Sequence, residues 1–269
     1  MRRGRIDESL DAFEKDFRFT RRLLAARDVL LIDKMIAAAS FRTSLLFISD
    51  LIRQGGLNDA QIARLADVVT PLSEDERSMA GVIAREYAGL ASTIQMPDEG
   101  VAATGPFASP AGQTALERAK DQLELHFFKY NATLNAAWAA ALENQAASRA
   151  PCTRLGGHAP HTLWGARPAL TSYFHNPAGK ILVMVGRPVF TDFLMAMCDL
   201  EGMRNIVGLQ LALRNEHVKV DDVAGFVKSA SSKFPNPYDN QPLSWAAGER
   251  TLGFQPIASR DGRFLPWAI

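Results

Sequence analysis

Three of the five histidines lie close together in the sequence and could bind a metal ion. His158 and His161 belong to the segment "HAPH", and His175 follows in the same Pro- and Gly-rich stretch. A zinc site needs three or four nitrogen, oxygen or sulfur ligands, so Cys152 or His175 could supply a third. Because no second cysteine or paired acid stands at ligand spacing, surface histidines in a loop are the simpler interpretation. We therefore expect no bound cofactor.

Signatures of other catalytic sites are missing from the sequence. It contains no phosphate-binding loop, dinucleotide fingerprint, H-E-x-x-H or activated-serine motif. Glu86 and Glu124 stand in helical, partly apolar stretches and could be inward-facing acids, although salt-bridged surface positions are the simpler interpretation. Acid–base catalysis needs two such groups in one cleft. If the protein is a hydrolase or a metal-dependent enzyme, its site belongs in the segment 152–176.

The composition is that of a globular protein with a net charge near zero. Of 269 residues, 47% are hydrophobic and 22% are charged, which is enough apolar surface for a sizeable core. The formal net charge is +1, whereas nucleic-acid binders usually carry a clear basic excess. We therefore expect no nucleic-acid partner.

Helical periodicity dominates most of the chain. One apolar face recurs from Ile6 to Leu24, and the stretch 28–53 continues as a second helix or as one bent long helix, interpreted as a buried core helix. The segment "SEDE" is a capping box that predicts a helix from Ser73 to about Ile94. Pro188 is expected to start or kink a later helix.

The period changes only near the C-terminus. Leu243 and Trp245 suit one short strand, the stretch 251–255 suits another, and Gly248 fits the turn between them. The sequence thus predicts a mainly α, multi-helix domain over residues 1–269, closed by a small antiparallel β-hairpin at about 241–256. If the chain is subdivided, the division is expected near 150–175.

The closing segment "NPYDNQPLSWAAGERTLGF" contains no good nucleophile or base. The residue before each of its prolines is biased towards extended conformations, which stiffens the start of the hairpin. We interpret the segment as a structural clasp over the end of the helical body. The clasp consists of Tyr238, Pro242, Leu243, Trp245, Leu252 and Phe254.

Three stretches together resemble a group of uncharacterised proteobacterial proteins: "PLSEDERSMAGVIAREY" at 71–87, "HNPAGKIL" at 175–182, and the closing segment. Members of that group have an N-terminal membrane anchor, a helical body outside the cytoplasm, and a similar C-terminal phrase. No activity is attached to the group, so the resemblance implies location: the periplasmic side of the inner membrane. The chain itself shows no signal or anchor and on its own is expected to be cytoplasmic. Membrane association is therefore expected only through an anchor that this chain lacks.

Cys152 and Cys198 are interpreted as two unrelated thiols, since neither belongs to a CxxC pair. The envelope location implied by the resemblance makes a disulfide between them more plausible. For function, we expect a non-enzymatic helical protein of the cell envelope that acts through protein or surface contacts. The alternatives are an enzyme with its site at 152–176, and a small-ligand binder that uses a cavity between helices. The oligomeric state is left open.

Overall fold

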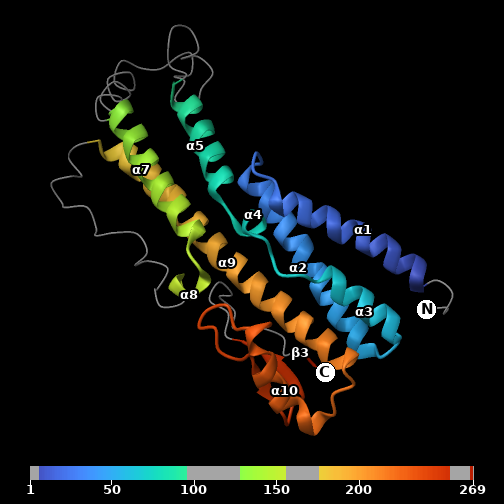
Figure 1. Cartoon of the computed structure of the whole chain (residues 1–269). Helices are drawn as coiled ribbons and strands as arrows, with labels where there is room; N and C mark the ends of the chain where they lie inside the picture. Colours follow the sequence, from blue (N-terminus) through green and yellow to red (C-terminus); the bar gives the residue numbers. More distant parts are fainter. Residues whose placement is uncertain (1–5, 96–127, 156–175, 255–266, 269) are drawn as a thin grey trace.

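A computed structural model describes residues 6–95, 128–155, 176–254 and 267–268 (Figure 1). The mainly α fold expected from the sequence is confirmed, with a small antiparallel sheet at the C-terminus. The longer helices are α1 (Ile6–Ala25), α2 (Leu31–Gln54), α3 (Asp59–Val68), α5 (Ala80–Gln95), α7 (Tyr130–Arg149) and α9 (Pro177–Asn215). The shorter ones are α4 (Glu74–Arg77), α8 (Cys152–Leu155) and α10 (Val223–Ser229).

The 39-residue helix α9 runs along the length of the molecule and contacts helices at both of its ends (Figure 1). At its start, the buried Asn176 accepts a hydrogen bond from the Lys129 amide (2.8 Å) and donates to Thr133 Oγ1 (2.8 Å), which fixes it to the beginning of α7. At its end, Arg214 donates to the Ile52 carbonyl of α2 (3.2 Å). Helix α9 therefore packs against α7 and against α2 and α3, and α7 in turn packs against α5.

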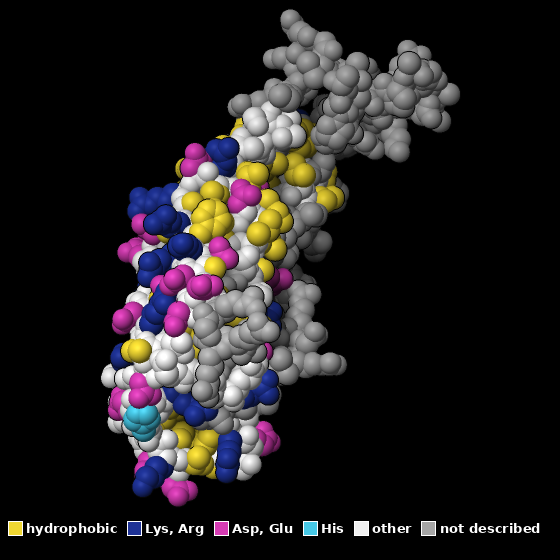
Figure 2. Space-filling model, turned by 90° about the vertical axis from the view of Figure 1, so that its right-hand side faces the viewer, with side chains coloured by type: hydrophobic (Ala, Val, Ile, Leu, Met, Phe, Trp, Pro, Cys, Tyr) yellow, Lys and Arg dark blue, Asp and Glu magenta, His cyan; other side chains and the backbone are white. Residues whose placement is uncertain are grey.

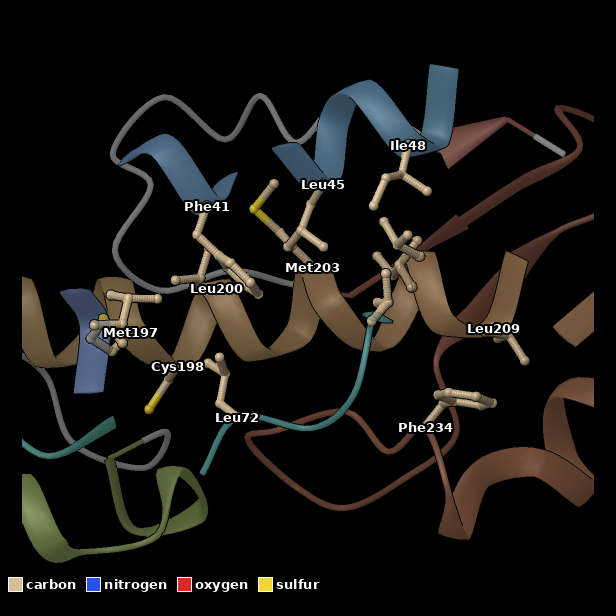
Figure 3. Close-up of a cluster of buried hydrophobic side chains, with 14 of the residues drawn as sticks. Phe41, Leu45, Ile48, Leu72, Met197, Cys198, Leu200, Met203, Leu209 and Phe234 are labelled. Carbon is tan, nitrogen blue, oxygen red and sulfur yellow. The ribbon is translucent and has the colours of Figure 1, made fainter. Parts of the chain in front are cut away.

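The apolar core forms where α2 crosses α9. Phe41, Leu45 and Ile48 of α2 point towards Leu200 and Met203 of α9, and all five are buried (Figure 3). Burying a large aliphatic or aromatic side chain contributes roughly 1.5–3 kcal/mol. The α2–α9 interface is therefore a major source of the stability of the fold.

Helix α2 is buried on one face only, which differs from the core helix expected from its composition. Ile32 (55% exposed), Ile36 (58%) and Phe47 (42%) lie on the opposite face. By length and composition, α2 could also cross a membrane, with a mean hydropathy of 1.5 over its best 18-residue window. Core helices of water-soluble proteins and signal sequences share these properties.

The helix expected from Ser73 to Ile94 is interrupted. The capping box is present, but α4 stops at Arg77, and Ser78 adopts an extended conformation before α5 begins. The reason is a tertiary contact: Lys34, 1% exposed, donates hydrogen bonds to the carbonyls of Ser78 and Asp75. Burial lowers the pKa of Lys34 to about 8, although the charges of Asp75 and Glu76 oppose the shift.

The start of the long helix lies earlier than one of the two expectations for Pro188. Pro188 was expected to start or kink a helix, but α9 begins at Pro177 and its helical backbone continues through position 188. Pro177 occupies the first turn, where a proline has no amide hydrogen bond to lose.

The C-terminal hairpin has the expected two strands and one more. β1 (Ser244–Ala246) and β2 (Thr251–Gly253) are antiparallel, with Trp245 opposite Leu252. β3 (Trp267–Ala268), which was not expected, pairs antiparallel with the other edge of β2. The sheet order is therefore β1-β2-β3.

Two glycines of α5 should respond oppositely to alanine. At Gly81, an added Cβ would overlap the carbonyl oxygen of Arg27, and backbone cannot rotate away as a side chain can. At Gly89, nothing lies within 4 Å of an added Cβ. We expect Gly81→Ala to lower the free energy of unfolding by about 1–3 kcal/mol, and Gly89→Ala to raise it by about 0.5–1 kcal/mol through helix propensity. Urea unfolding of the two variants measures both effects, and equal stabilities would contradict the close approach of α5 to Arg27.

Candidate functional site

The three histidines proposed for metal binding lie in a part of the chain that the structure does not describe. These are His158, His161 and His175, and Glu124 also lies outside the described residues. Within the described ranges, no group of three or more His, Cys, Asp or Glu side chains is arranged to hold a metal ion. The metal site therefore stays an untested alternative.

Cys152 and Cys198 form a disulfide, so the interpretation as two unrelated thiols is wrong. Their Cα atoms are 5.7 Å apart, and the bond joins α8 to the middle of α9. The pairing depends on the packing of α8 against α9, which cysteine spacing alone does not reveal. As a disulfide, Cys152 offers no thiolate to a metal or a substrate.

One candidate site is a pocket of about 290 Å³ between α5, α7 and α9, which we call the interhelical pocket. Most of its wall is apolar, and the first residue of α2, Leu31, also contributes. Its polar side chains are Glu86, Tyr87 and Asn144. Among the described residues that line the pocket, there is no histidine and no second carboxylate to pair with Glu86 in acid–base chemistry.

The two strongest hydrogen-bond acceptors of the interhelical pocket have different surroundings. Glu86 Oε1 accepts a hydrogen bond from the amide of Leu31 (2.8 Å) and so satisfies one of the free N–H groups at the start of α2. Asn144 is 3% exposed, and its Oδ1 has no hydrogen-bond partner among the described residues. An unsatisfied buried acceptor of this kind costs about 1–3 kcal/mol.

A second hollow of about 350 Å³ lies over the disulfide. Cys152 and Cys198 line it together with Arg77 and Leu155. Arg77 is already paired with Glu201 across 3.2 Å. The described chain stops at Leu155 beside this hollow and resumes at Asn176, so we assign no chemical role to the hollow.

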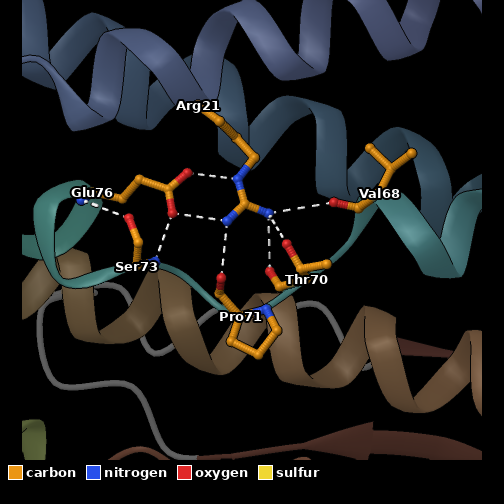
Figure 4. Close-up of polar contacts among 6 residues, drawn as sticks. All are labelled: Arg21, Val68, Thr70, Pro71, Ser73 and Glu76. Atoms are coloured by element: carbon orange, nitrogen blue, oxygen red, sulfur yellow. Dashed lines mark hydrogen bonds and ion pairs between the residues drawn. The ribbon is translucent and has the colours of Figure 1, made fainter.

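A polar network around Arg21 joins α1 to the chain between α3 and α4 (Figure 4). Its guanidinium donates two hydrogen bonds to the Glu76 carboxylate, at 2.5 and 2.8 Å. It also donates to the carbonyls of Val68, Thr70 and Pro71 and to Thr70 Oγ1. Because all of its donors are directed at the protein itself, Arg21 is structural and is not available to a ligand.

Burial and hydrogen bonding act oppositely on Glu76, which is 4% exposed. Burial alone would raise the pKa of its carboxyl, but the hydrogen bonds from Arg21 and Ser73 outweigh burial and lower the pKa below its usual value. The carboxylate is therefore held in its charged form and is not a proton donor near neutral pH.

Arg204 of α9 is a buried cation without a described counter-ion contact. It is 3% exposed, and its Nε has no hydrogen-bond partner among the described residues. Burial lowers its pKa to about 10, against the favourable charge of Glu201. Neither of the two hollows is lined by Arg204, so no ligand reaches it through them.

The proposed clasp lies against α9. The hydroxyl of Tyr238 hydrogen-bonds Asp199 and lies 3.3 Å from the carbonyl oxygen of Met195. Leu243, Leu252 and Phe254 are buried in the core cluster, with Trp245 packed against it, whereas Pro242 is exposed and bridges to Pro235. The role of these residues as a clasp stays a prediction.

Comparison with known proteins adds no assignment. No protein-family model, no curated protein and no solved structure matches the chain.

Proposed function

We propose that this is a non-enzymatic helical protein of the bacterial cell envelope that works by binding a protein partner through the exposed side of α1 and α2. The supporting observation is a set of large apolar side chains left uncovered there, which we call the outer apolar face. Its members are Phe19, Leu23, Ile32, Met35, Ile36 and Phe47. Clusters of exposed large apolar side chains are typical of interaction sites.

Helical spacing places these residues in rows. Phe19 and Leu23 are four residues apart on α1, and Ile32 and Ile36 are four apart on α2, so each pair lies on one side of its helix. Phe47 is joined to α1 by a ring contact with Phe13, at 5.3 Å between centroids. Figure 2 shows hydrophobic side chains gathered on the side of the molecule that faces right in Figure 1, beside a band of charged residues.

Charge favours a protein over a lipid surface as the partner. Helices that lie on anionic membranes carry Lys and Arg on their polar side. The exposed charged residues of α2 are balanced instead: Asp33 and Asp50 against Arg42 and Arg53. A bilayer with anionic headgroups would gain little from this mixture.

The disulfide supports a location in the cell envelope. Stable disulfides form in oxidising compartments such as the bacterial periplasm and are rare in the cytosol. Cys152–Cys198 therefore agrees with the envelope location implied by the resemblance of the sequence stretches at 71–87, 175–182 and 236–254.

In-cell cross-linking tests the contact. A photo-cross-linking amino acid at Ile36 is expected to give a discrete adduct of defined mass, whereas the same amino acid at the exposed Lys228 of α10 should give none. Adding Phe19→Asp to the Ile36 cross-linking variant should remove the adduct while changing stability by no more than about 0.5 kcal/mol, because Phe19 is 59% exposed.

Two results would count against the proposal. Equal cross-linking from Ile36 and Lys228 would show that the outer apolar face has no preferred partner. Flotation of the purified protein with anionic lipid vesicles, abolished by Phe19→Asp, would assign the same face to a membrane surface.

A further inference from the structure

We infer that the interhelical pocket is a binding site for a small, largely apolar molecule that carries a cationic amine. This inference concerns a different part of the molecule from the outer apolar face and does not depend on it. It rests on the size of the pocket, the unsatisfied acceptor in its wall, and the sign of its charge.

The volume limits the ligand to a small molecule. A cavity of about 290 Å³ lies at the lower end of the range of natural ligand sites. An apolar cavity about half that size already accommodates benzene. The pocket therefore suits a ligand on the order of ten non-hydrogen atoms.

Asn144 shows that the ligand must bring a hydrogen-bond donor. The walls from α7 are otherwise alanines, and an alanine or leucine at position 144 would pack in the same apolar surroundings without an unsatisfied group. Among the described residues, the buried Oδ1 of Asn144 instead has no hydrogen-bond partner, which lowers stability. A hydroxyl or an ammonium group in the pocket would supply the missing donor.

The charge of the wall selects the amine. Among the described side chains that line the pocket, Glu86 is the one charged group, and none of these side chains is a Lys or an Arg. Tyr87 and Phe190 add aromatic surface, which also attracts cations. A ligand carboxylate would face Glu86 and the oxygen of Asn144 and would be repelled by both.

Three probes that share a 2-phenylethyl group test this preference for an amine by calorimetry: 2-phenylethylamine, 2-phenylethanol and 3-phenylpropanoate. The amine is expected to bind most tightly, the alcohol more weakly, and the carboxylate not at all. Asn144→Leu should weaken binding of the amine about tenfold, the effect of one lost hydrogen bond. Glu86→Gln should also weaken binding of the amine, because the negative charge is removed, but not binding of the alcohol. Glutamine can still accept the hydrogen bond from the Leu31 amide, so the start of α2 should be unaffected.

Stability of the free protein supplies an independent readout. Asn144→Leu removes an unsatisfied buried acceptor and keeps a similar side-chain volume. It should therefore raise the melting temperature of the free protein and at the same time weaken binding of the amine. The matched control is Asn135→Leu, the same change at an exposed position of α7, which should leave binding of the amine unchanged.

Each failure overturns the inference. If none of the three probes binds at millimolar concentration, or if Asn144→Leu binds the amine as tightly as the wild type, the pocket is not the amine site. A lowered melting temperature for Asn144→Leu would show that the amide is a structural group satisfied within the free protein. Tightest binding of 3-phenylpropanoate would refute the assignment of charge.

Discussion

Removing the disulfide by replacing Cys152 and Cys198 with alanine is expected to lower the free energy of unfolding by about 4 kcal/mol. The bond closes a loop of 46 residues, and loop-closure entropy of the unfolded chain gives a stabilisation of about that size. Alanine is preferred to serine because Cys198 is 3% exposed and a hydroxyl there would be buried. Urea unfolding of the double variant and of the oxidised wild type measures the difference.

Reduction provides the control. The wild type in excess reductant should unfold at nearly the same urea concentration as the double alanine variant, and reductant should leave the variant unchanged. Unfolding midpoints of the wild type that coincide with and without reductant would contradict the prediction.

Arg21→Ala is expected to destabilise the protein by about 3–5 kcal/mol, the usual effect of removing one partner of a buried ion pair. The side chain of Arg21 is 15% exposed and that of Glu76 is 5% exposed, so the carboxylate would remain buried without its cation. The carbonyls of Thr70 and Pro71 would also lose a donor. Lysine, with one compact ammonium group, should restore only part of the loss.

Arg18→Ala is the matched control on the same helix. The side chain of Arg18 is 63% exposed, and it pairs with Glu14 at the i,i+4 spacing. The Glu14 side chain is only 9% exposed, but it keeps its ion pair with Arg64 when Arg18 is removed. A pair with a solvated arginine contributes at most about 1 kcal/mol, so this variant should be much closer to the wild type. Similar losses for the two arginines would show that the Arg21 network is not specially important.

The same network predicts that the free energy of unfolding decreases at acid pH. The pKa of Glu76 is lowered in the folded state, so its contribution is fully present above the unfolded value of about 4.3 and is lost as the pH falls through the folded value. In Arg21→Ala, the pKa of Glu76 should no longer be lowered by Arg21. The free energy of unfolding should therefore decline less between neutral and acid pH than in the wild type. Urea unfolding at a series of pH values measures both curves.

Local sequence signals predicted the helices and the hairpin because each depends on neighbouring residues. Asn58 caps α3 through a hydrogen bond from the Gln61 amide, and Ser73 caps α4, both as expected from capping preferences. The break at Ser78 was missed because its cause is Lys34, distant in sequence. Local propensity thus gave the type of the longer helices and of the β1–β2 hairpin, but not β3 or the short α8, and a tertiary contact sets where α4 ends.

The candidate site was much less predictable. Glu86 was identified as an acid that could point inward, but its actual contact, the amide of Leu31, depends on the packing of α5 against the start of α2. Asn144 gave no signal, because a single asparagine in an alanine-rich helix is equally compatible with an exposed position. Its significance appears only when three helices bury it without a partner.

The disulfide also has a consequence for the covalent integrity of the chain. Since Cys152 and Cys198 enclose the residues between them, a single peptide-bond cleavage anywhere in that interval produces two fragments that remain linked. The cleaved molecule would migrate as one species on a non-reducing gel and as two after reduction. A protease acting in this interval would therefore change the chain without releasing either half.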